Sequence, residues 1–125
     1  MQSYEEYVKY VETEAKKLIE ENYSDPNLTA AVVARRLNDR DILLPESGCY
    51  DSIRNRLSDY IKQVRINRSK ELLTETNMAV RDISNSCGFS GVTYFRSLFK
   101  TYVGIAPGQY RKKYKKKTLE EMSEG

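Results

Sequence analysis

Hydrophobic residues near the start of the chain recur at intervals of three and four, the spacing of one face of an α-helix. This pattern predicts a first helix from Tyr4 to Tyr23, which ends at the turn-forming residues 24–27. Thr29 is placed to cap a second, shorter helix. The apolar positions of that second helix are Ala30, Val33, Ala34 and Leu37.

In the middle of the chain the helical pattern of hydrophobic residues is interrupted and then resumes. Residues 38–48 contain a short apolar run that stops at Pro45 and is closely followed by Gly48, which predicts a loop or a broken helix. A helical pattern resumes between Tyr50 and Leu73, with arginines and lysines between the apolar positions. Part of this stretch is expected to form a long central helix.

The last third of the chain predicts two short helices around a corner, followed by a third. Val80 to Cys87 has helical spacing and stops at Gly88. Ser90 is placed to cap the next helix, which Gly104 and Pro107 end, and a last helix is expected over 109–114. Sustained alternation with a period of two is absent from the sequence, so we expect an all-α fold.

The amino-acid composition limits the classes of function that this chain can have. The 125 residues suffice for one compact domain or two very small ones. Histidine is absent and the two cysteines lack a CxxC spacing, so the usual general base and the commonest metal ligands are missing. We therefore expect no enzyme, no metal site and no cofactor. No run is apolar enough for a membrane span or a signal peptide, and a cytoplasmic location follows as an expectation.

Charge is distributed unevenly. The net charge is only +3, but residues 80–117 carry nine lysines and arginines against a single aspartate. A basic block of this kind is typical of a surface that binds a polyanion such as nucleic acid. A merely solvated basic surface explains it equally well on charge alone.

The two helices around Gly88 have the pattern of a helix-turn-helix, whose second helix can lie in the major groove of DNA. If Phe95 and Phe99 anchor that helix, its opposite face is free to read bases. The predicted base readers are Val92, Thr93, Arg96 and Ser97. The predicted phosphate ligands are Ser90, Gly91, Lys100, Arg111 and Lys112. A plain helix pair in a bundle is the alternative.

A longer motif runs through this segment: Asp82-Ile83, Gly88-Phe89-Ser90, Tyr94-Phe95, Phe99-Lys100, Gly104, Pro107 and Tyr110-Arg111. It resembles the signature of AraC/XylS-type transcription regulators. Further resemblance lies upstream, in Tyr23-Ser24-Asp25-Pro26, Leu28-Thr29, Val33-Ala34 and Leu37-Asn38, and in Tyr60-Ile61, Val64-Arg65 and Lys70-Glu71-Leu72-Leu73. Roughly residues 5–113 are covered.

The resemblance implies two helix-turn-helix subdomains of three homeodomain-like helices each, joined by a connecting helix and bound to double-stranded DNA. It also implies a transcription activator in the bacterial nucleoid that works near RNA polymerase, and a sensor or receiver domain on a longer parent chain. The expected organisation is a first subdomain over 1–56, a connecting helix over 57–75, a second subdomain over 76–117 and an acidic, flexible tail over 118–125.

The first subdomain departs from the family pattern. The family has a recognition helix directly after the Leu37-Asn38 corner and then a glycine turn, whereas this chain has Pro45 and Gly48 and no such turn. Arg40, Ser47, Tyr50 and Arg54 are the candidate DNA contacts there, or they merely cover a remodelled loop. A second, smaller departure is Ser84, where the family usually has alanine.

The acidic neighbours of those candidates oppose a close phosphate approach, so we expect specificity to rest on the second subdomain. A rival function from another class is a helical protein-interaction module that docks on RNA polymerase or a sensor domain, with DNA binding secondary.

Overall fold

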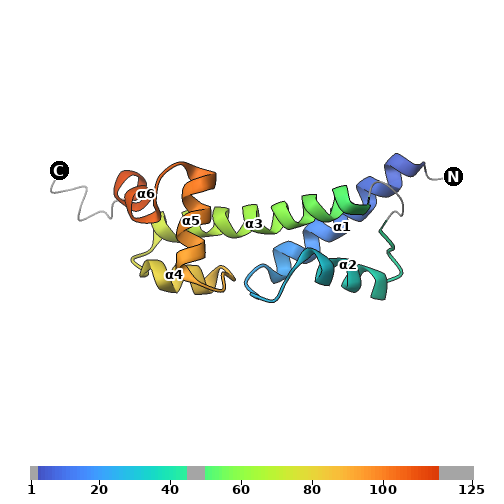
Figure 1. Ribbon diagram of the computed structural model, residues 1–125, viewed down its shortest axis with the longest axis horizontal. Helices are drawn as coiled ribbons and strands as arrows, with labels where there is room; N and C mark the ends of the chain where they lie inside the picture. The colour runs from blue at the N-terminus through green and yellow to red at the C-terminus, as the bar shows by residue number, and fades with distance from the viewer. Residues whose placement is uncertain (1–2, 45–49, 116–125) are drawn as a thin grey trace. The chain divides into compact units, whose positions relative to one another are not determined.

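The computed structural model describes residues 3–44 and 50–115, and for residues 50–52 it describes the backbone alone. All regular secondary structure in these residues is α-helical (Figure 1), which confirms the predicted fold class. The helices are α1 (Tyr4–Asn22), α2 (Ala30–Asp39), α3 (Tyr50–Glu75), α4 (Val80–Ser86), α5 (Val92–Val103) and α6 (Pro107–Tyr114). None of them is long and apolar enough to cross a membrane.

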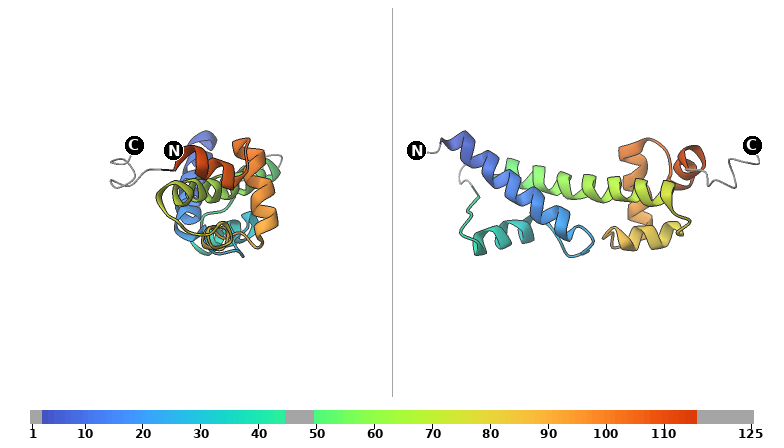
Figure 2. Two further views of the ribbon diagram at one scale, coloured as in Figure 1. Left: turned by 90° about the vertical axis from the view of Figure 1, so that its left-hand side faces the viewer. Right: turned by 180° about the vertical axis from the view of Figure 1, so that it is seen from behind.

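The chain forms two compact units, Met1–Arg65 and Ile66–Gly125, and the division falls inside α3. Each unit has its own hydrophobic core. In unit 1 the core comes from α1, α2 and the first half of α3, and its fully buried members include Ile19, Val33 and Ile53. In unit 2 the end of α3 packs with α4, α5 and α6 (Figure 2), around Ile83, Phe95 and Phe99.

Side-chain caps begin the first two helices. Ser3 accepts a hydrogen bond from the Glu6 amide and Glu6 accepts one from the Ser3 amide, the reciprocal arrangement of a capping box. At the start of α2 the Thr29 hydroxyl accepts from the Val32 amide at 3.2 Å, which confirms the cap predicted at Thr29.

Two side-chain contacts tie α1 to the first half of α3. Arg56 forms an ion pair with Glu12 at 2.5 Å, and the Tyr60 hydroxyl donates to Glu20 at 2.7 Å. Partial burial, followed by the hydrogen bond and the negative charge of Glu20, raises the pKa of Tyr60 to about 12. Tyr60 therefore keeps its proton, and this hydrogen bond, throughout the physiological pH range.

The segment between α2 and α3 is not a helix where the structure describes it. Residues 40–44 run without helical structure, with Ile42 and Leu44 buried in the core of unit 1. The Tyr7 hydroxyl donates to the Leu43 carbonyl at 2.5 Å and ties this segment to α1. The loop expected here is confirmed over these residues. Helix α3 then begins at Tyr50 and not at residue 57, the expected start of the connecting helix.

In unit 2 the corner between α4 and α5 is made by Gly88, whose φ of 88° is the left-handed conformation that favours glycine. The cap predicted at Ser90 is wrong, because Gly91 is the N-cap residue of α5 and supplies no side-chain acceptor. The Ser90 side chain is exposed one residue earlier. Helix α5 ends at Gly104 with φ 95°, as its position in the sequence predicted.

An arginine secures the turn before α2 in unit 1 and the turn before α4 in unit 2. Arg65 donates to the carbonyls of Tyr23, Asp25 and Leu28, at 2.9, 2.8 and 3.4 Å. In the same way Arg111 donates to the carbonyls of Leu73, Thr76 and Met78, at 3.0, 3.4 and 2.6 Å. Each guanidinium thus satisfies carbonyls at a helix end and in the following turn, which otherwise have no intrahelical partner.

Candidate nucleic-acid interface

Helix α5 has one face in the core and one in solvent. Phe95 and Phe99 are fully buried. Their rings extend an aromatic row, with centroids 4.9 Å apart between Phe89 and Phe95, 5.7 Å between Phe95 and Phe99, and 5.5 Å between Phe99 and Tyr110. Edge-on and tilted contacts at these distances hold the helix in a fixed rotation about its axis. The opposite side chains are therefore presented in a defined order.

The four predicted base readers lie on that opposite side. Thr93, Arg96 and Ser97 are exposed, and Val92 is half-buried. Neither Arg96 nor the exposed Lys100 one turn further forms an ion pair or a side-chain hydrogen bond within the described chain. Both cations are exposed and have no partner in the part of the chain that the structure describes.

The start of α5 carries backbone donors. Gly91 lacks a capping side chain, so the first amides of the helix have no partner of that kind. A Cβ added at Gly91 would meet nothing within 4 Å, so the surface above this residue is open. Free amides at a helix N-terminus attract anions.

Arg96 also borders a groove between α5 and α6. The groove measures about 360 Å³, and its other lining residues belong to the start of α6 and the residue before it. Lys112 of α6 lines the same groove. Arg96 and Lys112 therefore border one concavity, and both are exposed.

The predicted phosphate ligand Arg111 has a different position. Its guanidinium is turned toward the end of α3 and the following turn, where three carbonyls accept its hydrogen bonds. This finding corrects the expectation for Arg111, which packs within unit 2. Arg111 was mistaken for a surface cation because sequence spacing alone does not show what a half-buried side chain contacts.

The candidates of the first subdomain are not brought together as one site. Arg40 is the exposed C-cap residue of α2, and Arg54 is exposed on the first turns of α3. Ser47 and the Tyr50 side chain lie outside what the structure describes. The described residues between α2 and α3 include no separate recognition helix.

Sequence reasoning missed a groove in unit 1. It is lined by Thr29, Ala30 and Ala31 at the start of α2 and by Arg54, Asn55 and Ser58 of α3. Only Arg54 was among the expected contacts. The others were missed because their meeting depends on how the start of α3 packs against α2, which the helical pattern from Tyr50 does not show. The small pair Ala30-Ala31 after a capping threonine is the only hint.

Comparison with known proteins decides the family. A sequence model described as a helix-turn-helix domain matches residues 52–113. The C-terminal domain of the two-component response regulator yesN from Fusobacterium nucleatum is 31% identical, covers 78% of this chain and 93% of its own, and superposes with a TM-score of 0.66. This chain belongs to the AraC-type helix-turn-helix family.

Two further relatives agree. A transcriptional regulator from Chromobacterium violaceum, described as having an AraC-type DNA-binding domain, is 26% identical with a TM-score of 0.66 over 85% of this chain and 93% of that one. The Msm operon regulatory protein of Streptococcus mutans is 35% identical over 103 residues, which make up 79% of this chain and 35% of that relative. The domain therefore functions in sequence-specific DNA binding in transcription regulation, and it spans about a third of that curated relative.

Proposed function

We propose that α5 is the recognition helix and enters the major groove of duplex DNA, with Val92, Thr93, Arg96 and Ser97 facing the bases. The observation that supports this is the exposed, unpaired side of α5 opposite Phe95 and Phe99. Arg96 has the fork geometry for guanine O6 and N7, and Val92 with the Thr93 methyl suits a thymine methyl group. The Ser97 hydroxyl can form hydrogen bonds with several bases.

A second set of groups binds the DNA phosphates on either side of the major groove. Ser90 and the amides after Gly91 lie at the start of α5, and Lys100 lies one turn beyond Arg96. Lys112 lines the groove between α5 and α6, together with Arg96. These contacts carry no sequence information and give the salt-dependent part of the affinity. Arg111 is left out of this set because its donors are occupied within unit 2.

The test compares two cations on one helix face. Duplexes enriched from a random pool by the full chain supply the cognate site, and a scrambled duplex supplies the reference. Arg96→Ala is expected to cost about 1–3 kcal/mol on the cognate site and to relax the preference at one base pair. Lys100→Ala is expected to weaken both duplexes alike and to lower the slope of log Kd against log salt by about 1. If Arg96→Ala leaves the enriched sequence unchanged, the base-reading role is wrong.

By analogy with the family we infer that the domain acts as a transcription activator near RNA polymerase and is joined to a sensor or receiver domain in a longer parent chain. A non-enzymatic role agrees with relatives that are named as transcription regulators, although one, AdaA of Bacillus subtilis, is named as a bifunctional activator and DNA repair enzyme. Action on a bacterial promoter implies the cytoplasmic nucleoid.

A second candidate function, docking on a protein, is favoured by one feature of unit 1. Tyr10 and Leu43 are exposed by 44% and 59%, and Tyr4 near the start of α1 by 55%. Aromatic side chains such as those of Tyr4 and Tyr10 are enriched at protein interfaces. Duplex binding that weakens steeply with salt, with retained affinity in the variant Tyr10→Ser/Leu43→Ser, supports the DNA function. Salt-insensitive binding of a polymerase subunit that is lost in this variant supports the second.

A further inference from the structure

The two arginine contacts provide an internal alignment of the units. Arg65 in α3 and Arg111 in α6 each donate to three carbonyls around the turn that precedes α2 and α4, respectively. By this alignment α2 corresponds to α4, and the part of α3 before Arg65 corresponds to α6. The element of unit 1 that would correspond to the recognition helix α5 should then lie between α2 and α3.

The units differ at that element. Unit 2 has α5 between α4 and α6, and α6 begins at Pro107, about one turn before its arginine. In unit 1 the described residues after α2 are not helical, and α3 begins at Tyr50, roughly four turns before Arg65. The extended start of α3 therefore takes the place in the chain that a recognition helix has in unit 2.

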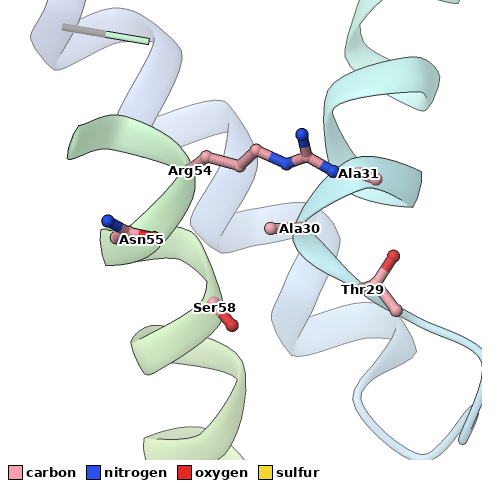
Figure 3. Close-up of a pocket in the computed structure, with 6 residues that line it drawn as sticks. All are labelled: Thr29, Ala30, Ala31, Arg54, Asn55 and Ser58. Carbon is pink, nitrogen blue, oxygen red and sulfur yellow. The ribbon is translucent and has the colours of Figure 1, made fainter. Parts of the chain in front are cut away.

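This extension packs against the rest of unit 1 and forms a groove with α2. Its residues Ile53, Leu57 and Ile61 are buried in the core of unit 1, and its outer side forms the groove with the first turn of α2. The groove has a volume of about 670 Å³. Figure 3 shows the Arg54 side chain extending from α3 toward Ala31 across this groove. Among the described residues that line the groove, none carries a carboxylate.

Arg54 differs from its neighbouring arginines in having no partner among the described residues. Arg56, on the side of α3 next to α1, is paired with Glu12, and Arg65 donates to backbone carbonyls. Arg54 forms neither an ion pair nor a side-chain hydrogen bond there. An exposed guanidinium over a groove of small polar and alanine side chains is complementary to a phosphate group.

We propose that the groove between α2 and α3 binds the sugar–phosphate backbone of duplex DNA, with Arg54 as the phosphate ligand, and that unit 1 reads no bases. A base reader must be convex, because it enters a groove of the duplex, whereas this surface is concave and suits a strand that lies across it. The inference rests on the proposed function, since it assigns a second contact to the same DNA.

The experiment measures duplex binding by the full chain, with Arg56→Ala as the matched control for Arg54→Ala. Both changes remove one exposed arginine from the same turns of α3. Arg54→Ala is expected to weaken cognate and scrambled duplexes by the same factor, about tenfold, and to lower the salt slope by about 1. Arg56→Ala is expected to leave both unchanged. Ala31→Gln keeps the charge but fills the groove, and should weaken binding without changing the salt slope.

Other results overturn the inference. If Arg54→Ala and Ala31→Gln bind like the unchanged chain while Arg96→Ala loses its cognate preference, the groove is not a DNA contact and the recognition role of α5 stands. If Arg54→Ala changes the enriched sequence, unit 1 reads bases. If the unchanged chain enriches no duplex, the proposed function itself fails. Circular dichroism of each variant checks that the helices are retained.

Discussion

Ser84 is a residue whose chemistry does not match its surroundings. Its side chain is fully buried in α4, and its hydroxyl has no hydrogen-bond partner among the described residues. A buried hydroxyl without a partner costs about 1–3 kcal/mol. Ser69, also fully buried in unit 2, differs because its hydroxyl donates to the Ile66 carbonyl at 2.6 Å. The two serines form a natural pair for comparison.

Ser84→Ala is expected to raise the free energy of unfolding of unit 2 by about 1 kcal/mol, since it removes the unpaired hydroxyl and improves helix propensity. Ser69→Ala also gains helix propensity but loses a made hydrogen bond, so we expect no stabilisation. Urea unfolding followed by circular dichroism measures both. Equal effects of the two substitutions would show that the Ser84 hydroxyl is not unsatisfied in solution.

Individual residues also show where sequence reasoning succeeds. The cap at Thr29 was predictable because a threonine before an apolar-periodic segment has one strong local use. The same reasoning failed at Ser90, because the corner at Gly88 places the following N-cap on Gly91. The spacing of Phe95 and Phe99 predicted which face of α5 is buried, and the structure confirms that both side chains are fully buried. The opposite face, which carries the candidate base readers, could therefore be predicted from the sequence.

At the level of elements, Arg111 joins α6 to the end of α3 and the turn before α4. Arg111→Gln removes the three guanidinium hydrogen bonds and is expected to lower the free energy of unfolding of unit 2 by about 2 kcal/mol. The salt slope of DNA binding should stay unchanged, because Arg111 is not a phosphate ligand. Lys112→Gln, one residue further and exposed, should show the opposite pattern, a lower slope by about 1 at unchanged stability. A lower salt slope of DNA binding for Arg111→Gln would show that Arg111 is a phosphate ligand after all.

The start of α3 is the element that sequence reasoning placed least well. The helical pattern itself was visible from Tyr50, but the expected connecting helix was set at residue 57, where the family resemblance is clear. Periodicity reports that a segment is helical and not which neighbour it packs against. The groove with α2 depends on the tertiary packing of Ile53 and Leu57, and the local sequence does not predict which residues these side chains contact.

For the molecule as a whole, the two hydrophobic cores have no buried residue in common. The core of unit 1 ends at Ile61 along the chain and that of unit 2 begins at Ile66, both within α3. Stability in such a protein need not be uniform, because each core can open with its own free energy. The family resemblance implied two subdomains, and the separation of these clusters shows that each unit has a core of its own.

Matched substitutions test this separation. Ile19 in α1 and Ile83 in α4 are both fully buried, each in a different core and neither in the shared helix. Ile→Ala at either site should cost about 2–5 kcal/mol. We expect hydrogen exchange measured by mass spectrometry to show lost protection in α1 and α2 for Ile19→Ala, and in α4, α5 and α6 for Ile83→Ala. The other unit should stay protected in each case, because its core keeps every contact. Equal loss across both units in either variant would mean that the chain unfolds as one cooperative body.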